Sequence, residues 1–320
     1  MRHARRVIVA AVDFSTAATR ALEWAADLAA ARRAELRLVH AAGWAEAGEG
    51  AFELPPALAA ELVAQARLQL AAAAGELHPH PHRVTWEAAV GPPAAVVLAE
   101  AARCHPELIV IGTRGQHGWR HPLLGTTAKR VMGRAPCPVL AVHPADAPPP
   151  TTPWRVLAAT DFSADAGQAA RAALRLLGDR TGELVLLHAL AAPRVDLSPG
   201  AVLSSPAARE LLEAARSRAL SQLAVDADDL LAAGVAVRTE LVEGRTPQAI
   251  VEAVEQLAAD VVTMGGRGQG GIEQLLLGSN VERVAKHARR PLLVLPRRAW
   301  VEDGAPAAAA AVGEEAETGD

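Results

Sequence analysis

VIVAAVDFS (residues 7–15) recurs as VLAATDFS (residues 156–163), and further matches extend this repeat over most of the chain. AELRLVHA (34–41) likewise recurs as GELVLLHA (182–189). These early matches are 148 positions apart, and later glycine and proline matches are 153 apart. A repeated unit of about 145 residues is too long for a solenoid repeat and has the size of a domain.

The repeat divides the chain into two domains. We expect a first domain over residues 1–145, a proline-rich, semi-rigid linker over 146–153 and a second domain over 154–298. Residues 299–320 are rich in alanine and glutamate without apolar periodicity, which predicts a disordered tail.

Each copy contains five short apolar runs separated by longer alanine-rich segments of helical period. The runs are VIVAAV, LRLVHA, RVTWEAAV, ELIVIG and CPVLAV in the first copy, and RVLAAT, ELVLLHA, VAVRTELV, DVVTMG and PLLVLP in the second. Continuous apolar runs are typical of parallel strands covered on both faces. Ser15 and Ser163 stand at predicted helix N-caps. The sequence predicts an α/β fold: two tandem Rossmann-like doubly wound units, each a five-stranded parallel sheet with helices on both faces.

Composition excludes several classes of function. The net charge is −4, and removing the six acids of residues 299–320 leaves +2, so there is no basic footprint for nucleic acid. No apolar run approaches the ~18 residues of a membrane helix. The N-terminal apolar stretch ends at Asp13 and is too short for a signal peptide. We therefore expect a cytoplasmic protein.

Glycines recur at one spacing in both copies, after the fourth predicted strand. The motif comprises Gly112, Gly115, Gly125, Thr126 and Thr127 in the first copy, and Gly265, Gly268, Gly278, Ser279 and Asn280 in the second. Glycines at the carboxyl edge of a sheet let main-chain amides face an anion. The third glycine precedes a predicted helix, whose uncapped start has N–H donors for a phosphate.

Phosphate contacts alone cannot give tight binding. A charge at a helix start is stabilised by about 0.3–2 kcal/mol, whereas micromolar affinity requires about 8 kcal/mol. A base slot and a sugar partner are therefore needed. The candidates for the slot are the strand ends at Val12, Val39, Ala41, Thr160, Leu187 and Ala189. Asp13 and Asp161 could accept hydrogen bonds from ribose, and Arg114 and Arg267 are either phosphate ligands or solvated side chains.

Other sequence motifs lack the surrounding features that their usual function requires. GRGQGG (266–271) matches GxGxxG but follows the fourth strand, so a dinucleotide fingerprint is not supported, and there is neither a P-loop nor a GxSxG motif. HPHPH (78–82) is interpreted as a surface loop instead of a metal site. His40 and His188 are interpreted as hydrogen-bonded core residues. The tryptophans at 24, 86 and 154 are assigned to packing, and the two isolated cysteines to ordinary thiols.

The combination of DFS, LLHA, G-x2-G-x9-G-[ST] and RxPCPVL or RRPLLVL resembles the universal stress protein (UspA-like) family, as a tandem pair over residues 5–143 and 154–296. The resemblance implies ATP binding, pairing of two units through their fifth strands, and a regulatory role under stress. It places Asp13 and Asp161 at the nucleoside and the glycine motifs around the phosphates. The first copy departs from the family pattern at Thr127 and in the loop that contains His117, Trp119 and Pro122.

The expected function is that of a cytoplasmic ATP-binding regulatory module, with Mg²⁺ carried by the phosphates if it is present. The two domains would form an intramolecular pseudo-dimer, and a homodimer of whole chains and the identity of a protein partner stay open. No catalytic residue and no metal ligand is assigned. The alternatives are a slow nucleotide hydrolase or transferase that uses the same pocket and a nucleotide-free interaction scaffold.

Overall fold

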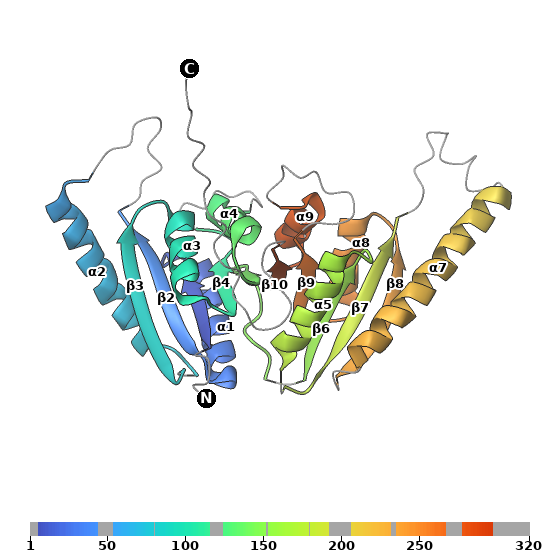
Figure 1. Cartoon of the computed structure of the whole chain (residues 1–320), viewed down its shortest axis with the longest axis horizontal. Coiled ribbons are helices and arrows are strands. Elements are labelled where there is room, and N and C mark those ends of the chain that lie inside the picture. The colour runs from blue at the N-terminus through green and yellow to red at the C-terminus, as the bar shows by residue number, and fades with distance from the viewer. Residues whose placement is uncertain are drawn as a thin grey trace, which may run out of the picture.

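The computed structural model describes residues 6–43, 54–79, 81–115, 124–151, 153–178, 180–191, 206–231, 235–266 and 277–296. Its strands form one ten-stranded sheet in the order β3-β2-β1-β4-β5-β10-β9-β6-β7-β8 (Figure 1). The strands are β1 Val7–Ala11, β2 Glu35–Ala42, β3 Arg83–Val90, β4 Leu108–Gly112, β5 Val139–Val142, β6 Trp154–Thr160, β7 Gly182–Leu190, β8 Ala236–Glu243, β9 Val261–Gly265 and β10 Leu292–Leu295.

The sheet consists of two equivalent halves that meet at its centre. Within each half all neighbouring strands are parallel, as predicted for a doubly wound unit. Between the halves, β5 and β10 pair in antiparallel orientation, with Leu293 opposite Leu140. The expected α/β fold is therefore confirmed, and so is the pairing through the fifth strand of each copy.

The described helices cover both faces of the sheet. They are α1 Thr16–Arg32, α2 Pro56–Gly75, α3 Pro93–Cys104, α4 Thr126–Arg134, α5 Ala164–Leu177, α7 Pro206–Leu231, α8 Thr246–Gln256 and α9 Ser279–His287. Ser15 and Ser163 are the N-caps of α1 and α5, and each hydroxyl accepts a hydrogen bond from an amide three residues later. Both cap predictions are confirmed.

Two hydrophobic clusters fill the space between the helices and the sheet. One cluster includes Ile8 of β1 together with residues of α1, α2, α5 and α7. The other includes the next residue, Val9, together with residues of α3, α4, α8 and α9. Successive strand residues point to opposite faces, so burial of both faces explains why the strands are continuously apolar.

The segment between the two halves is packed against two tryptophans. The indole nitrogens of Trp24 and Trp154 each donate a hydrogen bond of 3.0 Å, to the carbonyl oxygens of Ala147 and Pro150 respectively. The two rings meet edge to face at 5.4 Å, and both side chains are buried. Packing is thus confirmed for these two residues. It is wrong for Trp86, which is 38% exposed on the edge strand β3.

Polar contacts also join the halves. Arg180 Nη2 lies 2.6 Å from Asp27 Oδ2, and the Arg180 guanidinium lies 4.4 Å from the centre of the Trp154 ring. Lys129 Nζ of α4 also lies 2.5 Å from Glu282 Oε1 of α9. These two helices lie near the middle of the molecule (Figure 1). The two units are therefore held by side chains as well as by the β5–β10 pairing.

Candidate functional site

The turn between β1 and α1 is built around Asp13. Its Oδ1 atom accepts hydrogen bonds from the Ser15 amide at 3.0 Å and from the Ser15 hydroxyl at 2.6 Å. The same hydroxyl lies 3.4 Å from the carbonyl oxygen of Arg114, in the loop that follows β4. In the second half, Asp161 Oδ1 accepts from the Ser163 amide at 3.1 Å. Each aspartate is therefore a turn-forming residue, whatever else it binds.

The residue after each aspartate has an unusual backbone conformation. Phe14 and Phe162 have φ values of 60° and 64°, a left-handed region that bulky residues seldom adopt. Their rings lie against His40 and His188, with centroids 4.8 and 4.3 Å apart. The recurrence of this conformation in both halves marks the first strand-to-helix turn as a specially constrained part of the fold.

The two histidines hold neighbouring strand ends together. His40 Nδ1 donates to the Val12 carbonyl oxygen at 2.7 Å, and His188 Nδ1 donates to that of Thr160 at 2.8 Å. Both rings are partly buried. Their predicted role as hydrogen-bonded structural residues is confirmed.

Gly115 lies directly beside Asp13. A Cβ atom placed on Gly115 would be 2.9 Å from Asp13 Oδ2, which is closer than a side chain tolerates. The adjacent strands β1 and β4 thus bring the predicted nucleoside residue and the glycine motif of the first half together. This juxtaposition is the one that the sequence predicted for a ligand at the carboxyl ends of the strands.

Gly112 and Gly265 have a packing role that sequence reasoning missed. A Cβ atom on Gly112 would lie 2.9 Å from the carbonyl carbon of Ala17, and one on Gly265 would lie 3.1 Å from that of Asp165. Ala17 and Asp165 belong to the first turns of α1 and α5. These glycines therefore allow a strand end to approach a helix, and this approach explains them without a ligand.

The third glycine of each motif is the N-cap of the following helix. The Gly125 amide donates to the Thr113 carbonyl oxygen at 2.8 Å, and the Gly278 amide donates to that of Gly266 at 2.9 Å. The glycine amides themselves are thus engaged by the protein's own carbonyls. An anion at this position must use donors that begin one residue later along the chain.

The starts of α4 and α9 provide such donors. Neither Gly125 nor Gly278 caps its helix with a side chain, and the first helical bonds are made by the amides of Lys129 and Glu282. Across the residues that the structure describes, the intervening amides of 126–128 and 279–281 have no hydrogen-bond acceptor. An uncapped helix start is an anion-binding element.

The side chains at these helix starts are accessible. Thr126, Ser279 and Asn280 are exposed, and Thr127 is half-buried. By contrast, Ala41 is half-buried, and the other predicted slot residues are buried, namely Val12, Val39, Thr160, Leu187 and Ala189. The side chains of Val12 and Ala189 therefore serve the core.

Several predicted features lie outside the described residues. They are Arg267, Gly268, His80, His117, Trp119, Pro122 and the tail over 299–320. The roles expected for them stay predictions.

Thr113 and Asp146 are polar residues whose burial the sequence did not indicate. Thr113 is 4% exposed, and its hydroxyl has no hydrogen-bond partner among the described residues. Asp146 is 2% exposed, its Oδ2 atom accepts from the His143 amide at 2.7 Å, and burial raises the pKa of its carboxyl group to about 7. Thr113 lies inside the glycine motif and so could have been noticed, whereas Asp146 has no motif around it.

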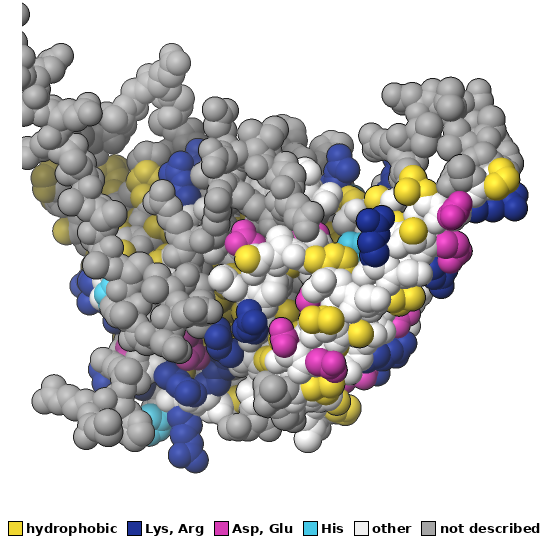
Figure 2. Space-filling model, turned by 45° about the vertical axis from the view of Figure 1, so that its right-hand side comes forward, with side chains coloured by type: hydrophobic (Ala, Val, Ile, Leu, Met, Phe, Trp, Pro, Cys, Tyr) yellow, Lys and Arg dark blue, Asp and Glu magenta, His cyan; other side chains and the backbone are white. Residues whose placement is uncertain are grey.

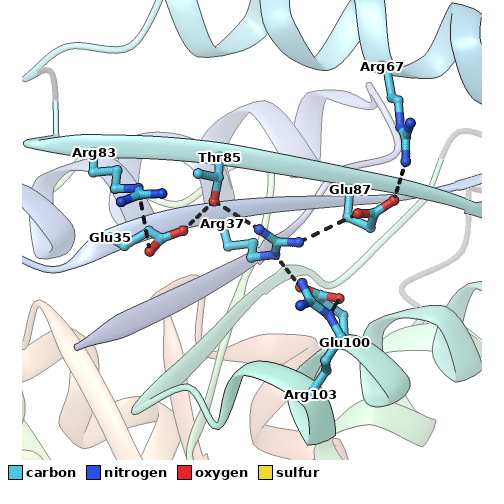
Figure 3. A network of polar contacts seen from close by, with 8 residues as sticks. All are labelled: Glu35, Arg37, Arg67, Arg83, Thr85, Glu87, Glu100 and Arg103. Atoms are coloured by element: carbon cyan, nitrogen blue, oxygen red, sulfur yellow. Dashed lines mark hydrogen bonds and ion pairs between the residues drawn. The ribbon is translucent and has the colours of Figure 1, made fainter. Parts of the chain in front are cut away.

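A second polar cluster, formed by residues of β2, β3, α2 and α3, is explained by ion pairing (Figure 3). Arg37 of β2 contacts Glu100 of α3, lies 3.5 Å from Glu87 of β3 and donates to Thr85 Oγ1 at 3.2 Å. Arg103 also contacts Glu100, at 2.7 Å. The buried charges are therefore matched, which is the condition for retaining them in a fold. We assign this cluster to structure.

Apolar side chains are also exposed on the side of the molecule that carries α7. They are interspersed with charged side chains (Figure 2). The exposed large apolar residues of α7 are Leu211, Leu220, Val225 and Leu231. Scattered exposure of this kind is ordinary for a protein surface.

Two absences apply to the described part of the chain. None of its helices combines the length and the apolar character needed to cross a membrane. It also contains no group of three or more His, Cys, Asp or Glu side chains placed to hold a metal ion.

The fold and the repeated helix starts at the ends of the fourth strands define a tandem α/β protein with two related candidate sites. The model of the universal stress protein family matches residues 4–143 and 154–296. The chain belongs to the universal stress protein family. Its likeness to Universal stress protein Rv2623 of Mycobacterium tuberculosis is 30% identity over 307 residues, covering 90% of this chain and 95% of the relative.

Other relatives match one unit or both. Universal stress protein MJ0531 of Methanocaldococcus jannaschii is 32% identical over 147 residues, covering 45% of this chain and 82% of that protein. The crystal structure of a universal stress protein from Archaeoglobus fulgidus has a TM-score of 0.64 at 21% identity, covering 91% of this chain and 98% of that one. This structural likeness supports the tandem fold.

Proposed function

We propose that the chain is a nucleotide-binding regulatory protein that takes one adenine nucleotide, ATP, in each half. The phosphates would lie on the first turns of α4 and α9, and the ribose on Asp13 and Asp161. Thr126, Thr127, Ser279 and Asn280 would add side-chain donors, as would Arg114 and Arg267. Mg²⁺ would accompany the phosphates, and a cytoplasmic location is part of this proposal.

One observation carries the proposal: both halves have an uncapped helix start beside the end of the fourth strand. In the first half, the neighbouring loop brings Gly115 to within contact distance of Asp13. A helix start contributes at most about 2 kcal/mol toward an anion, so the nucleoside must supply most of the roughly 8 kcal/mol of micromolar binding. A nucleotide that spans both elements fits this requirement better than free phosphate does.

Gly278→Asp tests the proposal at the second site. Gly278 has φ −64° and ψ 142°, which aspartate adopts readily, and an aspartate at an N-cap supplies its own oxygen to the first-turn amides. The variant should therefore fold while its carboxylate occupies the place of the phosphate. Titration calorimetry with ATP is expected to give about two sites in the wild type and about one in the variant.

Gly75→Asp is the matched control, because Gly75 has open space around it and lies near the end of α2. It should leave both sites unchanged. Full stoichiometry and affinity in Gly278→Asp would contradict the assignment. Absence of ATP binding by the wild type would favour the scaffold alternative, and ATP turnover that Gly125→Asp and Gly278→Asp together abolish would favour the enzyme.

A further inference from the structure

The junction between β5 and β10 places residues of the second half beside the first candidate site. Leu292 pairs with Ala141 in antiparallel register, so the chain just before β10 runs alongside the chain just after β5. The pairing ends at Leu292 and Ala141, and residues 289–291 lead into β10 at the end of the junction where β5 finishes. The end of β5 is therefore flanked by the second half on one side.

The loop of the first glycine motif flanks the same strand end on the other side. β4 pairs with β5 in parallel, and the Thr113 amide donates to the Val142 carbonyl oxygen at 2.8 Å. His143 thus follows the strand end that Arg114 flanks from the first half and that Arg289 approaches from the second. Burial lowers the pKa of His143, and the positive charges of Arg114 and Arg289 lower it further, which agrees with this placement.

Arg114 and Arg289 lack a matching acid among the residues that the structure describes. Neither Arg114 nor Arg289 makes an ion pair within the part of the chain that the structure describes. The buried carboxyl group of Asp146 is engaged by the His143 amide, and the charges that act on it are those of Arg290 and Arg20. Uncompensated like charges beside an uncapped helix start favour an anion.

The second half does not reproduce this arrangement. At the repeat offset of 153, Pro136 corresponds to Arg289, Pro296 to His143 and Gly266 to Thr113. The buried hydroxyl of Thr113, which has no partner among the described residues, is also confined to the first half. At the position equivalent to Arg289, the second site therefore has a proline from the opposite half, and Lys129, which reaches α9 from the first half, is paired with Glu282.

We propose that Arg289 completes the phosphate site of the first half from the second half, so that the first site favours nucleotides with two or three phosphates. Arg289 and Arg114 would approach the phosphate chain from opposite sides of β5. The second site would bind with its own residues alone and discriminate less between ATP and AMP. This inference rests on the proposed function and adds to it an inequality between the two sites.

The test isolates each site before removing the arginine. In a Gly278→Asp background, in which the first site is left, Arg289→Ala is expected to weaken ATP binding by roughly tenfold or more, the worth of a charge-assisted hydrogen bond. The effect on AMP should be much smaller, because AMP lacks the outer phosphates. Arg283→Ala removes the same charge from the exposed surface of α9 and should change neither affinity.

The reciprocal background identifies which site Arg289 serves. When Gly125→Asp has already removed the first site, Arg289→Ala should leave the remaining ATP affinity as it was. Equal losses in both backgrounds, equal losses for ATP and AMP, or no loss beyond that of Arg283→Ala would each overturn the inference while the proposed function stands. No ATP binding by the wild type would overturn the proposed function itself.

Discussion

Replacing Asp146 with asparagine is expected to remove a pH dependence of stability that the wild-type chain owes to one buried carboxyl group. Asp146 follows β5 and is 2% exposed. Its Oδ2 atom accepts a hydrogen bond from the His143 amide, and its Oδ1 atom has no partner among the described residues. Burial raises the pKa of the carboxyl group to about 7, although the His143 amide and the charges of Arg290 and Arg20 oppose this rise.

The raised pKa of Asp146 decides whether the free energy of unfolding rises or falls with pH. In the unfolded chain the group ionises near 3.8, so between about pH 4 and pH 7 the folded state holds a proton that the unfolded state has lost. The free energy of unfolding therefore falls as pH rises through this range and is level above about pH 7. At about 1.4 kcal/mol per unit of pKa difference, the upper limit of the loss is about 4 kcal/mol. Local relaxation around the ionised group reduces it, and we expect about 2–4 kcal/mol.

Urea unfolding of the wild type and Asp146→Asn at several pH values between about 4 and 8 measures this difference. Asparagine mimics the protonated acid. The free energy of unfolding of the variant should therefore rise steadily relative to that of the wild type as pH rises. Other titrating groups, including His143, are common to both proteins and largely cancel. Asp229→Asn changes an exposed acid on α7, and its free energy of unfolding should depend on pH in the same way as that of the wild type. Parallel curves for Asp146→Asn, or a wild type that is the more stable at pH 8, would refute the reasoning.

Two further changes test the packing of the fold. Gly112→Ala should lower the free energy of unfolding by about 1–3 kcal/mol without any nucleotide, since its Cβ atom would press on the first turn of α1, whereas Gly75→Ala should raise it by about 0.5–1 kcal/mol. Equal effects in urea unfolding would contradict the packing role of Gly112. Glu282→Lys should destabilise the contact with Lys129 by up to about 1 kcal/mol in low salt, and adding Lys129→Glu should restore it. A double variant no more stable than Glu282→Lys would argue against a direct pair.

The sequence was sufficient for the inner strands because burial on both faces leaves an apolar signal, whereas the edge strands β3 and β8 are only partly buried. It was sufficient for the caps at Ser15 and Ser163 because a cap is a local interaction. Trp86 was misassigned because its exposure depends on β3 being an edge strand. Strand order is set by connections and packing, and the apolar pattern of a single strand does not encode it.

The candidate site was predictable where it depends on neighbouring strand ends and unpredictable where it depends on contacts between the halves. The approach of Asp13 to Gly115 follows from the parallel pairing of β1 with β4. The burial of Asp146 does not follow from strand pairing within one half, because an acid next to a run of prolines is typical of an exposed linker. It is covered only when β5 meets β10 and the segment after it packs against α1.

The contacts between the halves also explain why a fused pair can do what two identical units cannot. Lys129 and Glu282 are 153 positions apart, so they are equivalent positions that meet across the junction at 2.5 Å. In a symmetric dimer of one unit that position would face its own copy, and like charges would repel. Arg289 and Pro136 are equivalent in the same way. On the proposal made above, an anion at the first site contacts both halves, whereas an anion at the second contacts one. Binding at the first site alone is therefore expected to strengthen the β5–β10 junction, because a ligand stabilises whichever arrangement of the chain it binds.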